Sequence, residues 1–146
     1  QNFDEVRDRL DPGLAAVIAA GRQVSGLTLA VANRERIAFA DQVRHFMDDY
    51  DLLLTPTLPV TAFPAGDDHP ATVAGQPTTY LGWTKFTYPF NLGGQPAATV
   101  PCGFAGEGLP VGLQIVGRVR EDATVLRAAA AFERARPWAQ DRPALD

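Results

Sequence analysis

The sequence predicts an α/β protein in which helices flank a mixed sheet, as an incomplete α/β/α layer. Four helical segments accompany three short apolar strands, and strands of that kind need helices on both sides of a sheet. Hydrophobic residues make up 46% of the 146 residues, which is enough for one domain with a core over residues 1–146. Only three strands are recognisable, so we expect this chain to be part of a larger layer.

Two long helices are predicted in the first third of the chain. Asp11 and Pro12 begin the first, because Asp accepts hydrogen bonds as an N-cap and Pro is tolerated at the first helical position. This helix runs to about Val24. The second covers about residues 28–50, where apolar residues recur at steps of three and four.

Two further helices lie in the second half. A short aromatic helix is expected before Gly93-Gly94, whose glycines, with the nearby prolines, end it. The last helix runs from Glu121 to Arg136, with acidic residues at its start and arginines at its end, which suits the helix dipole.

Three strands and one long loop complete the pattern. Leu52–Leu54 is a continuous apolar run, which is typical of a strand buried on both faces. Residues 97–101 form the second strand, and alternating residues in 111–117 form the third. The intervening segment 55–79 is predicted to be a loop, and loops of this length are usually functional.

Composition argues against several function classes. A net charge of −4 disfavours a nucleic-acid partner, and no apolar run reaches the length of about 18–20 residues that spans a membrane. The single cysteine, Cys102, cannot form an internal disulfide and favours a cytoplasmic location. Asp67-Asp68-His69 is a weak metal motif, interpreted as a solvated loop, so neither a metal nor another cofactor is expected.

Several segments resemble a known family. DLLLTPTLPV, then PFNLGGQPAATVP, then LPVGLQIVGR occur in that order. In this order they are similar to the carboxyl-terminal part of the amidase signature hydrolases, over about residues 11–137. The resemblance implies a partial amidase-type sheet and an enzyme that hydrolyses carboxamides through a serine acyl-enzyme.

The family's catalytic triad, as the resemblance implies it, needs two serines and a lysine. The lysine acts as the base, and one serine lies in a cis peptide. This chain has one serine, Ser25, and one lysine, Lys85, and no Gly-Ser-rich stretch surrounds Ser25. We therefore expect this chain to be a carboxyl-terminal fragment of an amidase. It should contain no catalytic residue, and the isolated chain should not turn over amides.

The aromatic segment before Asn91 is the candidate substrate-binding region. Trp83, Thr84, Phe86 and Phe90 are the predicted substrate-binding residues, and core packing is the alternative for the aromatic ones. Thr84 aligns with an aspartate that holds the substrate's ammonium group in the related amidotransferase A subunits. Since Thr84 has no charge, an apolar or aromatic acyl group is the favoured substrate class.

Two alternatives stay open: a non-catalytic binding or assembly module on an amidase scaffold, and part of an amidotransferase A-type subunit. The expected partners are a small amide substrate and the upstream amidase region or a second copy of the chain. Neither a nucleic acid nor a membrane is expected.

Overall fold

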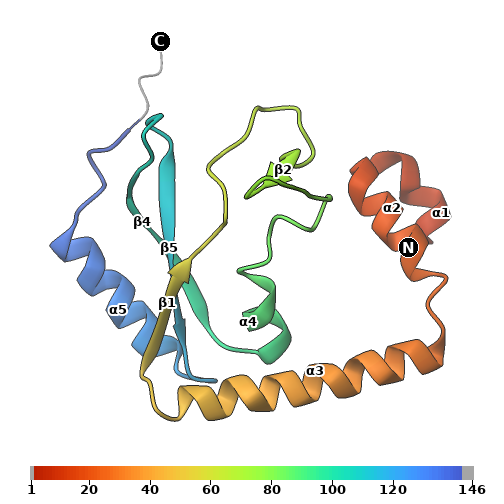
Figure 1. The fold of residues 1–146 in the computed structure, drawn as a ribbon, viewed down its shortest axis with the longest axis horizontal. Coiled ribbons are helices and arrows are strands. Elements are labelled where there is room, and N and C mark those ends of the chain that lie inside the picture. Colours follow the sequence, from red (N-terminus) through yellow and green to blue (C-terminus); the bar gives the residue numbers. More distant parts are fainter. Residues whose placement is uncertain (1, 143–146) are drawn as a thin grey trace. The chain divides into compact units, whose positions relative to one another are not determined.

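A computed structural model describes residues 2–142 as two compact units, divided between Arg36 and Ile37. The first unit contains α1 (Phe3–Val6), a 3-10 turn (Arg7–Arg9), α2 (Pro12–Gly21) and the beginning of α3 (Gly26–Met47). The second contains the end of α3 and all the strands (Figure 1). That residues 1–146 form a single amidase-type domain stays a prediction.

An exposed ion pair joins α1 to the end of α2 in the first unit. Arg22 donates hydrogen bonds of 2.9 and 3.1 Å to the carboxylate of Asp4, and its guanidinium lies 5.1 Å from the centre of the Phe3 ring. The Arg22 hydrogen bond holds the pKa of the Asp4 carboxyl below its ordinary value of 3.8. As predicted, Asp11 caps α2, accepting a hydrogen bond from Leu14 N–H at 3.0 Å.

This ion pair gives a pH-dependent prediction. Because the folded pKa of Asp4 is depressed, the pair's contribution to stability is present above pH 3.8 and is lost as the pH falls through the lower folded value. Arg22→Gln should raise the pKa of Asp4 toward 3.8, measured by NMR titration of its carboxyl carbon. Arg9→Gln is the control, and an unchanged Asp4 pKa in R22Q would contradict the assignment.

The second unit is built on an antiparallel sheet with the order β1-β5-β4. Its strands are β1 (Leu52–Pro56), β4 (Ala97–Phe104) and β5 (Pro110–Gly117), and all three coincide with predicted strands. The segment predicted as a loop contributes the end of β1 and a small pair, β2 (Thr72–Val73) and β3 (Gln76–Pro77). The α/β class is confirmed.

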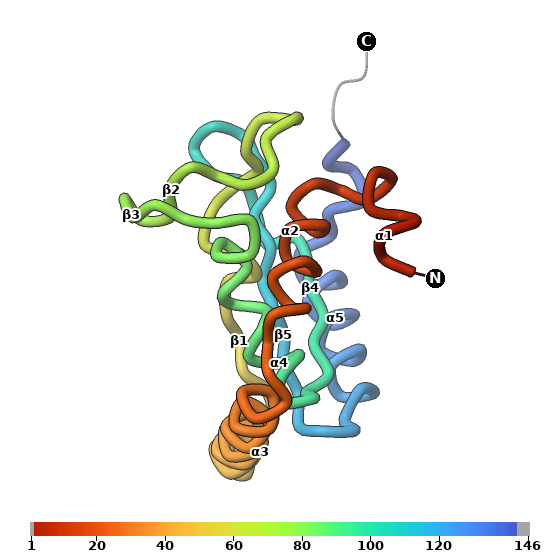
Figure 2. Tube along the Cα trace, turned by 90° about the vertical axis from the view of Figure 1, so that its right-hand side faces the viewer, coloured from red at the N-terminus to blue at the C-terminus, as the bar shows by residue number. Residues whose placement is uncertain are grey.

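One face of this sheet carries the core. α5 (Asp122–Ala135) lies along β4 and β5 in both views (Figures 1 and 2). Val125 of α5 is buried with Ile115 and Val100, and Phe132 packs against this cluster. β1 is an edge strand, and Leu54 on it is 57% exposed, so burial on both faces is wrong for this residue.

Two glycines have conformations or contacts that explain their positions. Gly94 ends the short aromatic helix α4 (Tyr88–Gly93) with φ of 79°, a left-handed conformation that favours glycine. Gly117 lies under α5, where a Cβ would stand 2.6 Å from Val125 Cγ2.

Gly117→Ala is therefore expected to destabilise the protein. Val125 is β-branched and 3% exposed, so it cannot easily rotate away. We expect a loss of about 1–3 kcal/mol in the free energy of unfolding, measured with urea. Gly106→Ala, which meets no atom within 4 Å, is the control; equal stability of the two variants would contradict this packing.

Arg118 fixes the end of α3 to the sheet. Its Nε donates to the carbonyl oxygens of Met47, the last residue of the helix, at 2.9 Å and of Tyr50, just beyond it, at 3.1 Å. Asp51 pairs with the same guanidinium at 3.3 Å. Among residues 2–142 no single helix is long and apolar enough to cross a membrane; α2 and α3 meet those criteria only as a joined, bent pair.

Candidate substrate-binding site

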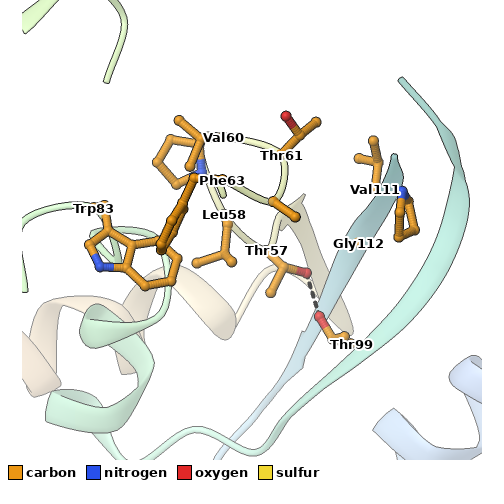
Figure 3. Close-up of a pocket in the computed structure, with 12 residues that line it drawn as sticks. Thr57, Leu58, Val60, Thr61, Phe63, Trp83, Thr99, Val111 and Gly112 are labelled. Atoms are coloured by element: carbon orange, nitrogen blue, oxygen red, sulfur yellow. Dashed lines mark hydrogen bonds between the residues drawn. The ribbon is translucent and has the colours of Figure 1, made fainter. Parts of the chain in front are cut away.

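The face of the sheet opposite α5 carries a row of polar side chains. The strand register places Thr55 of β1, Gln114 of β5 and Thr99 of β4 side by side. The hydroxyl of Thr57, just beyond β1, is hydrogen-bonded to that of Thr99 (Figure 3). Polar groups thus form the floor of this face, whereas α5 covers an apolar one.

Gln114 connects this floor to the aromatic segment. Its side chain is 4% exposed, and Nε2 donates to Thr55 Oγ1 at 2.9 Å and to the backbone oxygen of Phe86 at 3.0 Å. Both amide hydrogens are therefore used, one on a strand and one on the segment that precedes α4. Gln114 holds the aromatic segment against the sheet.

Gln114→Leu tests this connection. The replacement leaves the Phe86 carbonyl and the Thr55 hydroxyl without their donor, which should lower the free energy of unfolding by about 1–3 kcal/mol. Urea unfolding measures the change, with Gln42→Leu, at an exposed helix position, as the control. If Q114L is as stable as Q42L, Gln114 does not hold the segment.

A cavity of about 590 Å³ opens above the polar row. The loop after β1 forms one wall, Trp83 another, and the β4–β5 hairpin a third (Figure 3). Its volume is within the range of about 300–1,000 Å³ usual for small-molecule sites. The lining residues are Thr57–Phe63, Trp83, Thr99 and Pro110–Gly112.

The wall of this cavity is aromatic. The rings of Phe63 and Trp83 meet edge to face, with centroids 5.2 Å apart and planes at 89°. The Trp83 indole N–H donates to Tyr80 O at 3.0 Å, so its hydrogen-bonding group is already used within the segment. Trp83 therefore offers carbon atoms to a ligand.

Hydrogen bonds hold the loop 57–63 at several points. Besides the Thr57–Thr99 pair, Thr61 Oγ1 donates to Glu107 Oε1 at 2.9 Å, which ties the loop to the β4–β5 turn. Gly112 faces Thr57, where a Cβ would lie 2.8 Å from Thr57 Oγ1. The cavity is thus preformed by side-chain contacts and by the absence of a side chain at Gly112.

The four predicted site residues have different environments. Trp83 lines the cavity. Thr84 is half-buried beside it and donates its hydroxyl to Leu81 O at 3.0 Å. Phe86 is 40% exposed and contributes its backbone oxygen to Gln114, and Phe90 is 8% exposed in α4. Substrate contact by all four residues, Trp83 included, stays a prediction.

None of the residues that line the cavity is ionisable, so this wall supplies neither a base nor an acid. Ser25 has a structural role as the N-cap of α3. Its Oγ accepts a hydrogen bond from Thr28 N–H at 3.0 Å. Cys102 is half-buried and donates to Val111 O at 3.4 Å. No cluster of three metal-ligating side chains occurs within residues 2–142.

The sequence predicts a functional loop over residues 55–79 but indicates neither which of its residues line the cavity nor the role of Gln114. Gln114 lies in an alternating strand, where a polar residue is usually exposed. Its burial depends on the Phe86 carbonyl, 28 residues away in the sequence.

Comparison with protein families identifies the fold. The family model for amidases matches residues 5–126. The chain belongs to the amidase signature family. An acylamidase from Rhodococcus erythropolis is 40% identical over 145 residues, 98% of this chain and 30% of that protein. The A subunit of glutamyl-tRNA(Gln) amidotransferase from Thermosynechococcus vestitus is 39% identical over 114 residues, 78% of this chain and 23% of that subunit.

Solved amidase structures agree. A bacterial aryl acylamidase of the amidase signature family superposes with a TM-score of 0.78 at 34% identity, over 97% of this chain and 31% of the enzyme. A 6-aminohexanoate cyclic dimer hydrolase superposes with a TM-score of 0.76 at 32% identity, over 94% of this chain and 30% of that hydrolase. The chain thus spans about a third or less of the length of the amidases it matches.

Proposed function

We propose that this chain forms a substrate-facing wall of an amidase that hydrolyses carboxamides with an apolar, aromatic acyl group. The observation that carries this proposal is the apolar cavity lined by the contacting rings of Trp83 and Phe63, in a chain of the amidase family. Burial of a ring there removes apolar surface from water, and the edge-to-face pair leaves aromatic carbon free to pack on it.

The catalytic groups are proposed to lie in the remaining amidase region. In that arrangement the wall binds the acyl group, orients the scissile amide and excludes water from it. The hydroxyls of Thr57 and Thr99 are hydrogen-bonded to each other, which uses one of their two O–H hydrogens, and no residue that lines the cavity is ionisable. The cavity residues therefore affect substrate choice more than proton transfer.

Similarity to the amidotransferase A subunits favours a second candidate function. Several of them are 36–46% identical to this chain. Thr84 is uncharged and donates its hydroxyl to Leu81 O, so it cannot form an ion pair with an amino-acid substrate. We rank transfer of ammonia to an acyl group below hydrolysis of an aromatic amide.

A chimera tests the proposal. The matching segment of the Rhodococcus erythropolis acylamidase is replaced by this chain, which aligns over 98% of its own length. We expect the chimera to hydrolyse an aromatic acylamide, such as a benzoyl anilide, faster than it hydrolyses glutamine. A folded chimera that hydrolyses neither would support the non-catalytic module, and a preference for glutamine would support the amidotransferase candidate.

A further inference from the structure

A second cavity lies between the β4–β5 hairpin and the segment that follows α5. Its volume is about 820 Å³. Residues 101–104 and 108–110 line it from the hairpin, and residues 136–138 and 140–142 line it from the other side. Apart from Pro110, it shares no residue with the cavity at Trp83, so it is a separate site.

Aromatic side chains give this cavity its apolar surface. Trp138 is half-buried, and its ring lies 6.4 Å from that of Phe132, which packs against the core. Phe104 in β4 also lines the cavity and is 57% exposed, so its ring is accessible to a ligand there. A planar ring can therefore contact aromatic carbon from both the hairpin and the terminal segment.

Two arginines give the cavity its charge. Arg136 and Arg142 both line it, and neither forms an ion pair with a carboxylate of residues 2–142. Arg142 Nε donates to Ala139 O at 3.4 Å, which leaves its two terminal nitrogens for other acceptors. Asp141 also lines the cavity. With two arginines and one aspartate, the lining has a net charge of +1.

We propose that this cavity binds a small aromatic carboxylate. A guanidinium group presents paired N–H donors that match a carboxylate, and Trp138 and Phe104 supply the surface for the ring. A neutral aromatic compound would lack the charged contacts, and acetate would lack the ring. The inference does not depend on the proposed amidase function, because binding is measured without turnover.

The test is titration of the whole chain with 2-naphthoate by isothermal calorimetry. Saturable binding is expected, and Arg136→Gln should weaken it about tenfold, as is typical for loss of a charge-assisted hydrogen bond. Arg142→Gln should also weaken it. Arg134→Gln, at the end of α5 and outside the cavity, is the matched control and should bind 2-naphthoate like the parent chain.

Two neutral or truncated probes complete the test. 2-Naphthylmethanol and acetate should each bind at least tenfold more weakly than 2-naphthoate, and NMR shifts on binding should include the indole N–H of Trp138. Circular dichroism checks that each variant is folded. Absence of saturable 2-naphthoate binding by the folded chain would overturn the proposal. So would equal affinity for 2-naphthylmethanol, or equal weakening by R134Q and R136Q.

Discussion

Replacing Trp83 with alanine is expected to lower kcat/KM for an aromatic acylamide about 30- to 100-fold in the acylamidase chimera. The change removes the ring that meets Phe63 at the cavity wall. Truncation of a large aromatic contact is expected to cost about 2–2.7 kcal/mol, which corresponds to this change in rate. Acetamide, which does not fill the cavity, should be hydrolysed at nearly the parent rate.

Two further variants separate substrate contact from general damage. Trp83→Phe keeps a ring and should retain most of the activity toward the aromatic amide. Phe46→Ala removes an exposed ring that lines neither cavity, and should leave the preference between the two amides unchanged. Equal losses for acetamide and the aromatic amide in W83A would mean that Trp83 supports the fold rather than the substrate.

The second large effect is the absence of turnover by the chain alone. Its one serine caps a helix, its one lysine, Lys85, is exposed, and the cavity is lined by residues that carry no ionisable group. We expect the isolated chain to hydrolyse benzamide no faster than buffer does. In the chimera, whose catalytic groups come from the acylamidase, Lys85→Ala should leave kcat within about twofold of the parent, because Lys85 is exposed and does not line the cavity.

Ser25 is tested in the same way, with stability as a second readout. Ser25→Ala should leave kcat of the chimera nearly unchanged while destabilising α3 by about 1 kcal/mol, the usual cost of losing an N-cap. Ser25→Asn keeps a capping side chain and should restore that stability. Loss of turnover in both S25A and S25N would identify Ser25 as a catalytic residue and contradict the account.

Much of the fold could be predicted because local chemistry specifies it. Asp11 and Pro12 mark a helix start by capping, and the acidic and basic ends of α5 mark its bounds within a residue. The strand order β1-β5-β4 could not be predicted, because pairing between distant strands depends on tertiary contacts. For the same reason the exposure of Leu54 on an edge strand was missed.

The candidate site was only half predictable. Trp83 could be proposed because aromatic residues crowd its segment, and it does line the cavity. Phe63 could not, because it lies in a loop with no periodic pattern and reaches Trp83 only through the fold. Gly93 is predicted to end the aromatic helix, and it is the last residue of α4; it also leaves room for the Gln95 side chain, because a Cβ there would collide with Gln95 Oε1.

The most direct test of the central claim is a crystal structure of the chimera after reaction with an aryl fluorophosphonate, whose fluoride is displaced when a catalytic serine bonds to phosphorus. The account predicts that phosphorus is bonded to a serine outside this chain and that the aryl ring lies in the cavity against Trp83 and Phe63. Phosphorus bonded to Ser25, or a ring bound away from Trp83, would contradict it.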